Sequence, residues 1–312
     1  MISVNGEAAP ICGEMVERKG ELGIGVDELG NGATVIDAGI EALGGLSAGK
    51  LYTEACLGGL AEVNFTKDKR LRVHLIVDRP AIACMASQYA GWRISVGDYF
   101  AMGSGPARAL ARVENLYDDL DYGDDSDSAV IALETREMPS VEVADFVAEK
   151  CGIEPRDLRI LVAPTASIVG SVQISSRVVE TGVHKLHELG FDVKRIISAS
   201  GSAPVAPVAK DDLTAMGMTN DCSLYGGRTI YFVDAEDSEI GEVIEEMPSS
   251  SSEDYGSPFI EVFEKYDRDF YKIDARLFSP AEVTINNVRT GRVFSSGSIN
   301  EEVLQKSLEG SS

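Results

Sequence analysis

The chain has 312 residues, of which 51 are Asp or Glu and 28 are Lys or Arg, so its formal net charge is −23 at pH 7. This length typically holds about two domains of roughly 150 residues, and 44% hydrophobic residues suffice for a buried core, which excludes global disorder. Because an acidic chain without a run of Lys and Arg has little to exchange for phosphate counterions, nucleic-acid binding is also excluded.

The start of the chain and its Cys and His content bear on location and cofactors. Residues 1–7 lack the basic and apolar segments of a signal peptide, and no apolar run approaches the ~18–20 residues that span a bilayer. We therefore expect a cytoplasmic protein without a membrane partner. The 5 Cys are widely spaced without a CxxC pair and only 3 His occur, so we expect no metal site. The acidity fits either a salt-rich cytoplasm or ordinary solubility.

In the first half of the chain, short strand-like runs alternate with turns and helices. Apolar or alternating runs predict strands, while a proline in the first turn and a glycine after the last turn mark helices. The expected elements are a strand at 34–37, a strand at 70–77, a helix at 80–90, a strand at 127–134 and a helix at 140–150.

The second half continues this mixture. A strand at 158–162 leads into a long helix at 167–189. Later strands are expected at 195–197, 229–233 and 282–285. Acidic helices are expected at 238–246 and 259–266. Strands interleaved with helices indicate an α/β fold with α+β elements. The acidic stretch 118–127 and Pro139 suggest two domains, 1–138 and 139–312, with crossings of the chain between them left open.

Three segments rich in glycine and small hydroxyl side chains adjoin predicted helix starts or strand ends. In the first, Gly103, Ser104 and Gly105 precede Pro106, so backbone N–H groups and Arg108 could hold an anion. A simply capped helix is an equally good interpretation. The segment lacks the third glycine of a dinucleotide fingerprint and the Gly-Lys-Ser/Thr end of a P-loop.

The other two segments follow predicted strands. Thr165 and Ser167 precede the long helix, and Ser200 follows the strand at 195–197. Such hydroxyls cap a helix more often than they hold a ligand, but open α/β sheets bind ligands at the carboxyl ends of their strands. These three residues are therefore candidate binding residues.

A polar stripe runs along the predicted long helix. Gln173, Arg177, Glu180 and His184 are spaced by 4, 3 and 4 residues and therefore line one face. The simpler interpretation of Arg177 and Glu180 is a helical ion pair worth a few tenths of a kcal/mol. The functional interpretation is a carboxylate whose orientation and protonation are controlled by a neighbouring guanidinium.

Several blocks of the sequence, in one order and across nearly the whole chain, resemble a known family. They are residues 97–110, 162–173, 177–181, 219–221, 225–227, 254–256 and 269–274. On these residues the chain resembles the methenyl-tetrahydromethanopterin cyclohydrolases. The resemblance implies a metal-free cytoplasmic enzyme of one-carbon metabolism and methanogenesis, with two α/β domains facing a large cleft and a homotrimeric assembly.

The implied reaction is the reversible hydrolysis of the methenyl bridge of a pterin coenzyme, tetrahydromethanopterin, to a formyl group. The coenzyme is the substrate, and the resemblance implies no further cofactor. The bridging carbon lies between two nitrogens that share a positive charge, so it is already electrophilic. Water then only has to be positioned and deprotonated.

The family's catalytic residues carry over to the Arg-x-x-Glu motif. The resemblance makes Glu180 the general base and Arg177 the residue that orients Glu180 and keeps it ionised. Some relatives carry Lys where this chain has Tyr89, so Tyr89 is a candidate substrate contact with packing as the alternative. The remaining candidates for binding the pterin and its anionic tail are Gly103, Ser104, Gly105, Thr165, Ser167, Gln173, Ser200 and, first for the tail, Arg108.

Two alternatives stay open on the sequence alone. A tetrahydrofolate-type coenzyme carries the same bridge and differs in pterin methyl groups and tail. A non-catalytic pterin- or phosphate-binding protein on the same fold would need only the anion-binding loops, and the Arg177–Glu180 pair argues against it.

Overall fold

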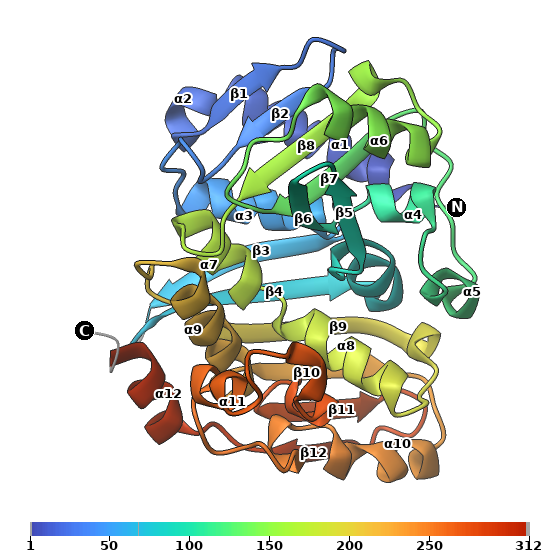
Figure 1. Cartoon of the computed structure of the whole chain (residues 1–312). Coiled ribbons are helices and arrows are strands. Elements are labelled where there is room, and N and C mark those ends of the chain that lie inside the picture. Colours follow the sequence, from blue (N-terminus) through green and yellow to red (C-terminus); the bar gives the residue numbers. More distant parts are fainter. Residues whose placement is uncertain (1, 68, 310–312) are drawn as a thin grey trace. The chain divides into compact units, whose positions relative to one another are not determined.

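The protein was analysed as a computed structural model, which describes residues 2–67 and 69–309 and falls into two compact units (Figure 1). The first unit spans Met1–Val63 and Ile82–Gln173, and the second spans Asn64–Ala81 and Ile174–Ser312. The chain therefore crosses between the units after residues 63, 81 and 173. The expected boundary between residues 138 and 139 lies inside the first unit. Each unit holds a six-stranded sheet with helices, which confirms the predicted α/β class.

The first unit is built on a mixed sheet whose central strands are parallel. Its strands, in spatial order, are β1 (Gly25–Glu28), β2 (Thr34–Asp37), β8 (Leu158–Ala163), β7 (Ala129–Glu134), β6 (Tyr99–Ser104) and β5 (Trp92–Val96). β2, β8 and β7 run parallel, whereas β1, β6 and β5 pair antiparallel with their neighbours. The carboxyl ends of β2, β8 and β7 consequently share one edge of the sheet.

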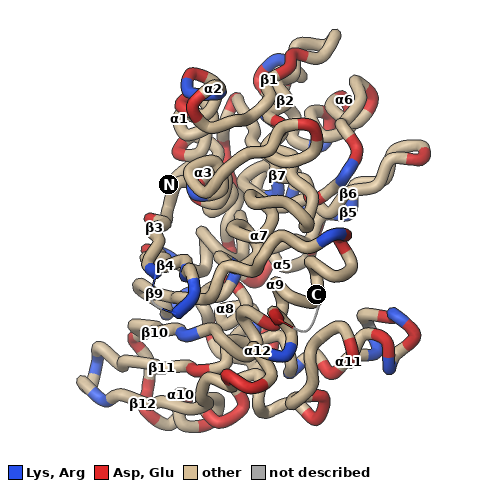
Figure 2. Tube along the Cα trace, turned by 90° about the vertical axis from the view of Figure 1, so that its left-hand side faces the viewer, with Lys and Arg blue, Asp and Glu red and all other residues tan. Residues whose placement is uncertain are grey.

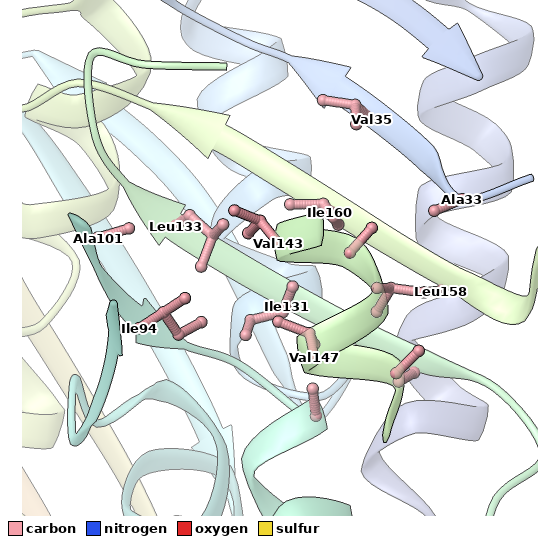
Figure 3. Packing of buried hydrophobic residues seen from close by; sticks show 14 of the residues in the cluster. Ala33, Val35, Ile94, Ala101, Ile131, Leu133, Val143, Val147, Leu158 and Ile160 are labelled. Carbon is pink, nitrogen blue, oxygen red and sulfur yellow. The ribbon is translucent and has the colours of Figure 1, made fainter. Parts of the chain in front are cut away.

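Helices cover this sheet and bury its apolar side chains. They are α1 (Val4–Glu17), α2 (Lys19–Leu22), α3 (Leu46–Cys56), a π-helix (Ala81–Gln88), α4 (Ala107–Ala111), α5 (Leu116–Leu120), α6 (Val141–Cys151), a 3₁₀ turn (Pro155–Asp157) and α7 (Ile168–Ser175). Figure 3 shows Val143 and Val147 of α6 against Ile131 and Ile160 of the sheet. The predicted helix at 140–150 is confirmed, because Ser140 caps its N-terminus and Gly152, at φ +70°, ends it.

The second unit contains the other sheet. Its strands, in spatial order, are β12 (Val293–Gly297), β11 (Glu282–Asn287), β10 (Arg228–Val233), β9 (Ile196–Pro204), β4 (Leu71–Asp78) and β3 (Ala61–Lys67). β10 and β11 are parallel, whereas β4–β9, β9–β10 and β11–β12 are antiparallel pairs.

The helices of the second unit are α8 (Val178–Glu188), α9 (Asp212–Leu224), α10 (Asp237–Val243), α11 (Phe259–Lys265) and α12 (Glu301–Glu309). Short 3₁₀ turns occupy Val193–Arg195, Ile244–Glu246, Ser249–Ser251, Phe270–Lys272 and Ala275–Leu277. α8 packs closely on β9, because a Cβ on Gly201 would lie 2.5 Å from Cγ2 of Val179. In the described part of the chain, no helix is long and apolar enough to cross a membrane.

Three sequence predictions differ from the structure. The expected helix at 167–189 is broken into α7 and α8 at Ser176 and Arg177, where the Arg177 N–H bonds to the Ile174 carbonyl instead of continuing the helical ladder. The expected helix at 80–90 is a π-helix. The strand expected at 195–197 continues to Pro204, so the segment around Ser200 is strand and not loop.

Candidate active site

The loop after β8 carries two of the predicted hydroxyl residues. The Ser167 hydroxyl donates to the Pro164 carbonyl at 2.8 Å and accepts from the Gly170 N–H at 2.9 Å, so it caps the start of α7. The Thr165 hydroxyl donates to Oε1 of Glu134. Of the two, Ser167 therefore shapes the loop, while Thr165 fixes a carboxylate.

Glu134 is a candidate site residue that the sequence did not single out. It is the last residue of β7, opposite Ala163 in the parallel pairing with β8, and its side chain is half-buried. Open α/β sheets place ligands outside the carboxyl ends of such strands. The available signal was an acidic residue at the end of an otherwise apolar run, 129–134.

A rigid loop follows β2 at the same edge. The Asp37 carboxylate, 3% exposed, accepts hydrogen bonds from the backbone N–H groups of residues 39, 40, 41 and 42. Gly39 packs so closely that a Cβ there would lie 2.7 Å from the Ser167 hydroxyl. The loop carries Leu43, which is 84% exposed. This edge therefore presents an exposed apolar side chain and the Thr165–Glu134 pair.

The segment at Gly103, Ser104 and Gly105 is not an anion cradle in this structure. The Gly105 N–H donates to the Ser87 carbonyl at 2.8 Å, and the Arg108 N–H donates to the Gly105 carbonyl at 3.2 Å. α4 has only 5 residues, and Ser104 still belongs to β6. Because β6 runs antiparallel to β7, Gly105 points toward the amino half of β7 rather than toward the edge that carries Thr165.

Arg108 is not available to an anionic tail, which corrects the sequence prediction. Its side chain is 0% exposed, and its guanidinium donates to Glu114 and to the carbonyls of Met85 (3.0 Å) and Ser87 (2.9 Å). Burial lowers the pKa of Arg108, but Tyr117 and the hydrogen-bonded Glu114 outweigh burial, so the pKa is raised and the group stays charged. Arg108 is thus a buried structural cation.

Tyr89 lies directly beside this cation. The Cζ atom of Arg108 is 5.3 Å from the centroid of the Tyr89 ring, a cation–π distance, and the Tyr89 N–H donates to the Cys84 carbonyl at 2.7 Å. Gly91 is required next to it, because a Cβ would overlap the Glu114 carboxylate. The half-buried Tyr89 ring is therefore held in place from one side by the Arg108–Glu114 pair.

In the second unit, Arg177 and Glu180 lie together where α8 begins. Arg177 is the N-cap residue and Glu180 belongs to the first turn, where the helix dipole stabilises a negative charge. Nη1 of Arg177 is 3.8 Å from Oε2 of Glu180, and the two side chains are only 13% and 6% exposed. The pair is therefore withdrawn from bulk solvent, unlike an ordinary surface ion pair.

Two other predicted residues, Gln173 and Ser200, lie on other elements than α8. Gln173, 3% exposed, belongs to α7, so the expected single stripe along one helix is wrong. The Ser200 hydroxyl donates to the Leu75 carbonyl at 3.0 Å within the sheet. Because its neighbour Gly201 faces α8, Ser200 lies on the opposite face of the sheet, away from Glu180. Among the described residues, no group of three or more Cys, His, Asp and Glu is arranged to hold a metal ion.

Comparison with known proteins gives a consistent result. The profile of the family described as Cyclohydrolase (MCH) matches residues 3–308. The methenyltetrahydromethanopterin cyclohydrolase of Methanococcus maripaludis strain C7 is 51% identical over 319 residues, covering 99% of both chains. The protein of the same name from Methanothermobacter marburgensis is 50% identical over 318 residues, covering 99% of both chains. The one from Methanocaldococcus jannaschii is 49% identical over 318 residues, covering 99% of this chain and 98% of its own length.

Proposed function

Since the chain belongs to the MCH cyclohydrolase family, we propose that it catalyses the reversible hydrolysis of methenyltetrahydromethanopterin to formyltetrahydromethanopterin. Identity near 50% over almost the full length of the named relatives supports this activity. The observation that carries the mechanism is the buried Arg177–Glu180 pair at the start of α8.

The first chemical step uses Glu180 as the general base. Water attacks the cationic bridging carbon, a C–O bond forms, and Glu180 accepts the proton that the water loses. The electron pair of the C=N bond moves to nitrogen, so the adduct is neutral. Arg177 is the positioning residue, because its positive charge orients the carboxylate and favours its ionised form before the attack.

The second step opens the ring. One C–N bond of the adduct breaks, and the leaving nitrogen takes the proton held by Glu180. The hydroxyl of the adduct loses its proton as the formyl C=O forms, so one proton is released for each water consumed. The reverse reaction follows the same path, with Glu180 protonating the hydroxyl that leaves.

Substrate binding in the first unit is proposed for the edge formed by β2, β8 and β7. The edge of a pterin that carries its amino group and ring N–H matches a carboxylate, and Glu134 is fixed for that task by the Thr165 hydroxyl. Leu43 on the loop after β2 offers an exposed apolar contact at this edge. Tyr89, whose ring is held by Arg108, is proposed as a separate substrate contact. For the anionic tail, the buried Arg108 no longer serves as a partner.

We also make proposals about the location, the oligomeric state and the cofactors of the enzyme. We propose a cytoplasmic homotrimer that takes the pterin coenzyme as its substrate and uses no further cofactor. Support for this proposal comes from the family of the chain, whose model matches residues 3–308.

The direct test is spectroscopic. The purified protein is mixed with methenyltetrahydromethanopterin, and the near-ultraviolet absorbance of the methenyl chromophore is followed. We expect enzyme-dependent decay to an equilibrium that is also reached from the formyl side. Stoichiometric binding without decay would instead identify a non-catalytic pterin-binding protein.

The same assay on methenyltetrahydrofolate decides the coenzyme. The two substrates carry the same bridge, so a preference must come from the pterin methyl groups and the tail. We expect a higher kcat/KM for the methanopterin coenzyme, and an equal or higher value for the folate would reassign the substrate.

A further inference from the structure

The helix that carries Glu180 is fastened to the sheet of the second unit by a buried tyrosine. α8 lies over β9 and β10 in the views of Figures 1 and 2. Tyr231 of β10 is fully buried, and its hydroxyl donates to the Val179 carbonyl in the first turn of α8 at 3.0 Å. The peptide group that contains this carbonyl also contains the Glu180 N–H. Tyr231 therefore binds the backbone from which the Glu180 side chain extends.

Gly182 makes room for this hydroxyl. A Cβ on Gly182 would overlap the Tyr231 hydroxyl oxygen and would lie 2.9 Å from Cζ of the ring. Gly182 lies inside α8, where glycine is less favourable than alanine because it loses more backbone freedom on folding. A hydroxyl in a core also costs free energy unless it finds a partner. The chain thus combines two locally unfavourable choices at one contact, which is expected at functional sites.

Two further glycines let the first turn of α8 approach the sheet closely. A Cβ on Gly201 of β9 would lie 2.5 Å from Cγ2 of Val179, and a Cβ on Gly227 would lie 2.8 Å from Cγ2 of Val178. These apolar contacts set the distance between the helix and the sheet, but they have no preferred direction. The Tyr231 hydrogen bond is directional, so it fixes where the turn lies along the sheet and how it is rotated.

Tyr231 lies on the wrong side of the helix to take part in the reaction itself. Glu180 and Gly182 are two residues apart, so they point in directions roughly 200° apart around the helix axis. Because Gly182 faces Tyr231, the Glu180 side chain extends on the side of α8 away from the sheet. Any effect of Tyr231 on the reaction therefore passes through the backbone of the first turn.

We propose that Tyr231 is a positioning residue for the general base, with Gly182 as its required counterpart. The hydrogen bond to Val179 holds the first turn of α8 where the Glu180 carboxylate meets the attacking water. A displacement of about 1 Å at such a group can cost on the order of 10²-fold in rate. The inference rests on the proposed role of Glu180 and extends it to a residue on the opposite side of the helix.

The first test removes only the hydroxyl. Tyr231→Phe keeps the buried ring but leaves the turn without its directional contact, so kcat should fall by about 10-fold while KM changes by less than about twofold. The matched control is Tyr122→Phe, which removes the hydroxyl of another buried tyrosine, one that donates to the Ile2 carbonyl at 2.8 Å. The control should lose some stability in urea and keep wild-type kcat. Wild-type kcat in Tyr231→Phe would overturn the proposal.

A second variant separates position from stability. Gly182→Ala added to Tyr231→Phe puts a methyl group where the hydroxyl was, with a small shift of the ring, and replaces a helical glycine by alanine. The double variant should therefore resist urea at least as well as Tyr231→Phe, although the hydrogen bond to Val179 is still missing. Its kcat, for each folded molecule, should stay about 10-fold below that of the wild type. Return of kcat to the wild-type value in the double variant would overturn the proposal.

Glu180→Gln in the same assay reports on the proposed function separately. Loss of turnover in Glu180→Gln together with wild-type kcat in Tyr231→Phe would keep Glu180 as the base and overturn only the positioning role. Turnover retained in Glu180→Gln would instead overturn the role of the base, and the positioning role of Tyr231 with it.

Discussion

Nη1 of Arg177 and Oε2 of Glu180 lie 3.8 Å apart at the first turn of α8, with 13% and 6% of the two side chains exposed. Exposed ion pairs at this helical spacing contribute only about 0.2–0.5 kcal/mol. When the pair is buried, each charge depends on the other, because removal of one partner leaves an uncompensated charge that costs about 3–5 kcal/mol. Because the pair is buried, a change in either side chain should affect the stability of the protein as well as the proposed reaction.

Replacing the base should remove turnover and keep binding. Glu180→Gln preserves shape and hydrogen-bonding atoms but accepts no proton, so kcat should fall by about 10²- to 10⁴-fold. Binding of the methenyl coenzyme, measured by fluorescence or calorimetry, should change little. Glu188→Gln is the matched control on the same helix, with a 58% exposed side chain, and should keep wild-type kcat. Wild-type turnover in Glu180→Gln would reduce the pair to a structural ion pair.

The arginine can be tested by a double variant that separates stability from catalysis. Arg177→Met leaves the buried Glu180 carboxylate without its cation, so we expect both kcat and the free energy of unfolding to fall. Adding Glu180→Gln removes the unpaired charge, and the double variant should recover stability but not activity. Urea unfolding and the absorbance assay measure the two quantities. Recovery of both together would contradict the catalytic role.

Elements with local signals could be predicted from the sequence, and elements decided by distant contacts could not. The helix at 140–150 is marked by its own cap and closing glycine, Ser140 and Gly152. The sequence does not mark the break between α7 and α8. Ser175 and Ser176, which lie at the break, are both fully buried, so the pattern of buried positions continues across it. Ser200 has loop-like neighbours, but pairing with Ile76 and Ile230 makes the segment a strand.

The same distinction holds for the candidate site. Arg177 and Glu180 are three residues apart, so a local motif and a family resemblance were enough to find them. The partners of Arg108 include the Met85 and Ser87 carbonyls, 23 and 21 residues earlier in the chain, and sequence spacing does not reveal such contacts. Glu134 and Thr165 lie 31 residues apart and meet only because β7 and β8 pair.

The structural role assigned to Arg108 predicts a loss of stability. Arg108→Met would leave Glu114 without its cation and the Met85 and Ser87 carbonyls without a donor, so unfolding should become easier by about 3–5 kcal/mol. Arg156→Met, at a 76% exposed position in the same unit, should change stability by less than about 0.5 kcal/mol. A raised KM with unchanged urea unfolding would instead restore Arg108 as a tail contact.

Glu134 should affect substrate binding more than chemistry. Glu134→Gln removes the charge from a carboxylate held by Thr165, so charge-assisted hydrogen bonds to the pterin become ordinary ones. We expect KM to rise by about 10-fold or more, with kcat changed by less than about threefold. Glu137→Gln on the following exposed loop is the control. A fall in kcat at constant KM would place Glu134 in the chemical step.

The last prediction concerns pH and stability. Asp221 of α9 is fully buried, and it accepts from the Phe259 N–H at the start of α11 (2.9 Å) and from the Ser307 hydroxyl of α12 (2.6 Å). Burial raises the pKa of Asp221 to about 7, although these two hydrogen bonds lower it and the nearby Glu261 raises it further. In the unfolded chain the carboxyl titrates near its ordinary value of about 4.

The direction in which stability changes with pH follows from the number of protons bound in the folded and unfolded states. Between about pH 4 and 7 the folded state holds more protons on Asp221 than the unfolded state, so this residue makes the free energy of unfolding fall as pH rises through that window and level off above it. Asp221→Asn can accept from Phe259 and donate to Ser307 without ionising. The variant should therefore gain stability relative to the wild type from about pH 5 to 7, and the gain should level off above pH 7, in urea titrations at one fixed protein concentration.

Asp211, the N-cap of the same helix, provides the control. The Thr214 N–H and hydroxyl lower the pKa of Asp211, so it is ionised in both states above about pH 5. The stability difference between Asp211→Asn and the wild type should then be constant over the same range. If the Asp221→Asn difference were equally flat, Asp221 would be ionised in the folded protein, and its contacts with α11 and α12 would be those of a buried carboxylate at neutral pH.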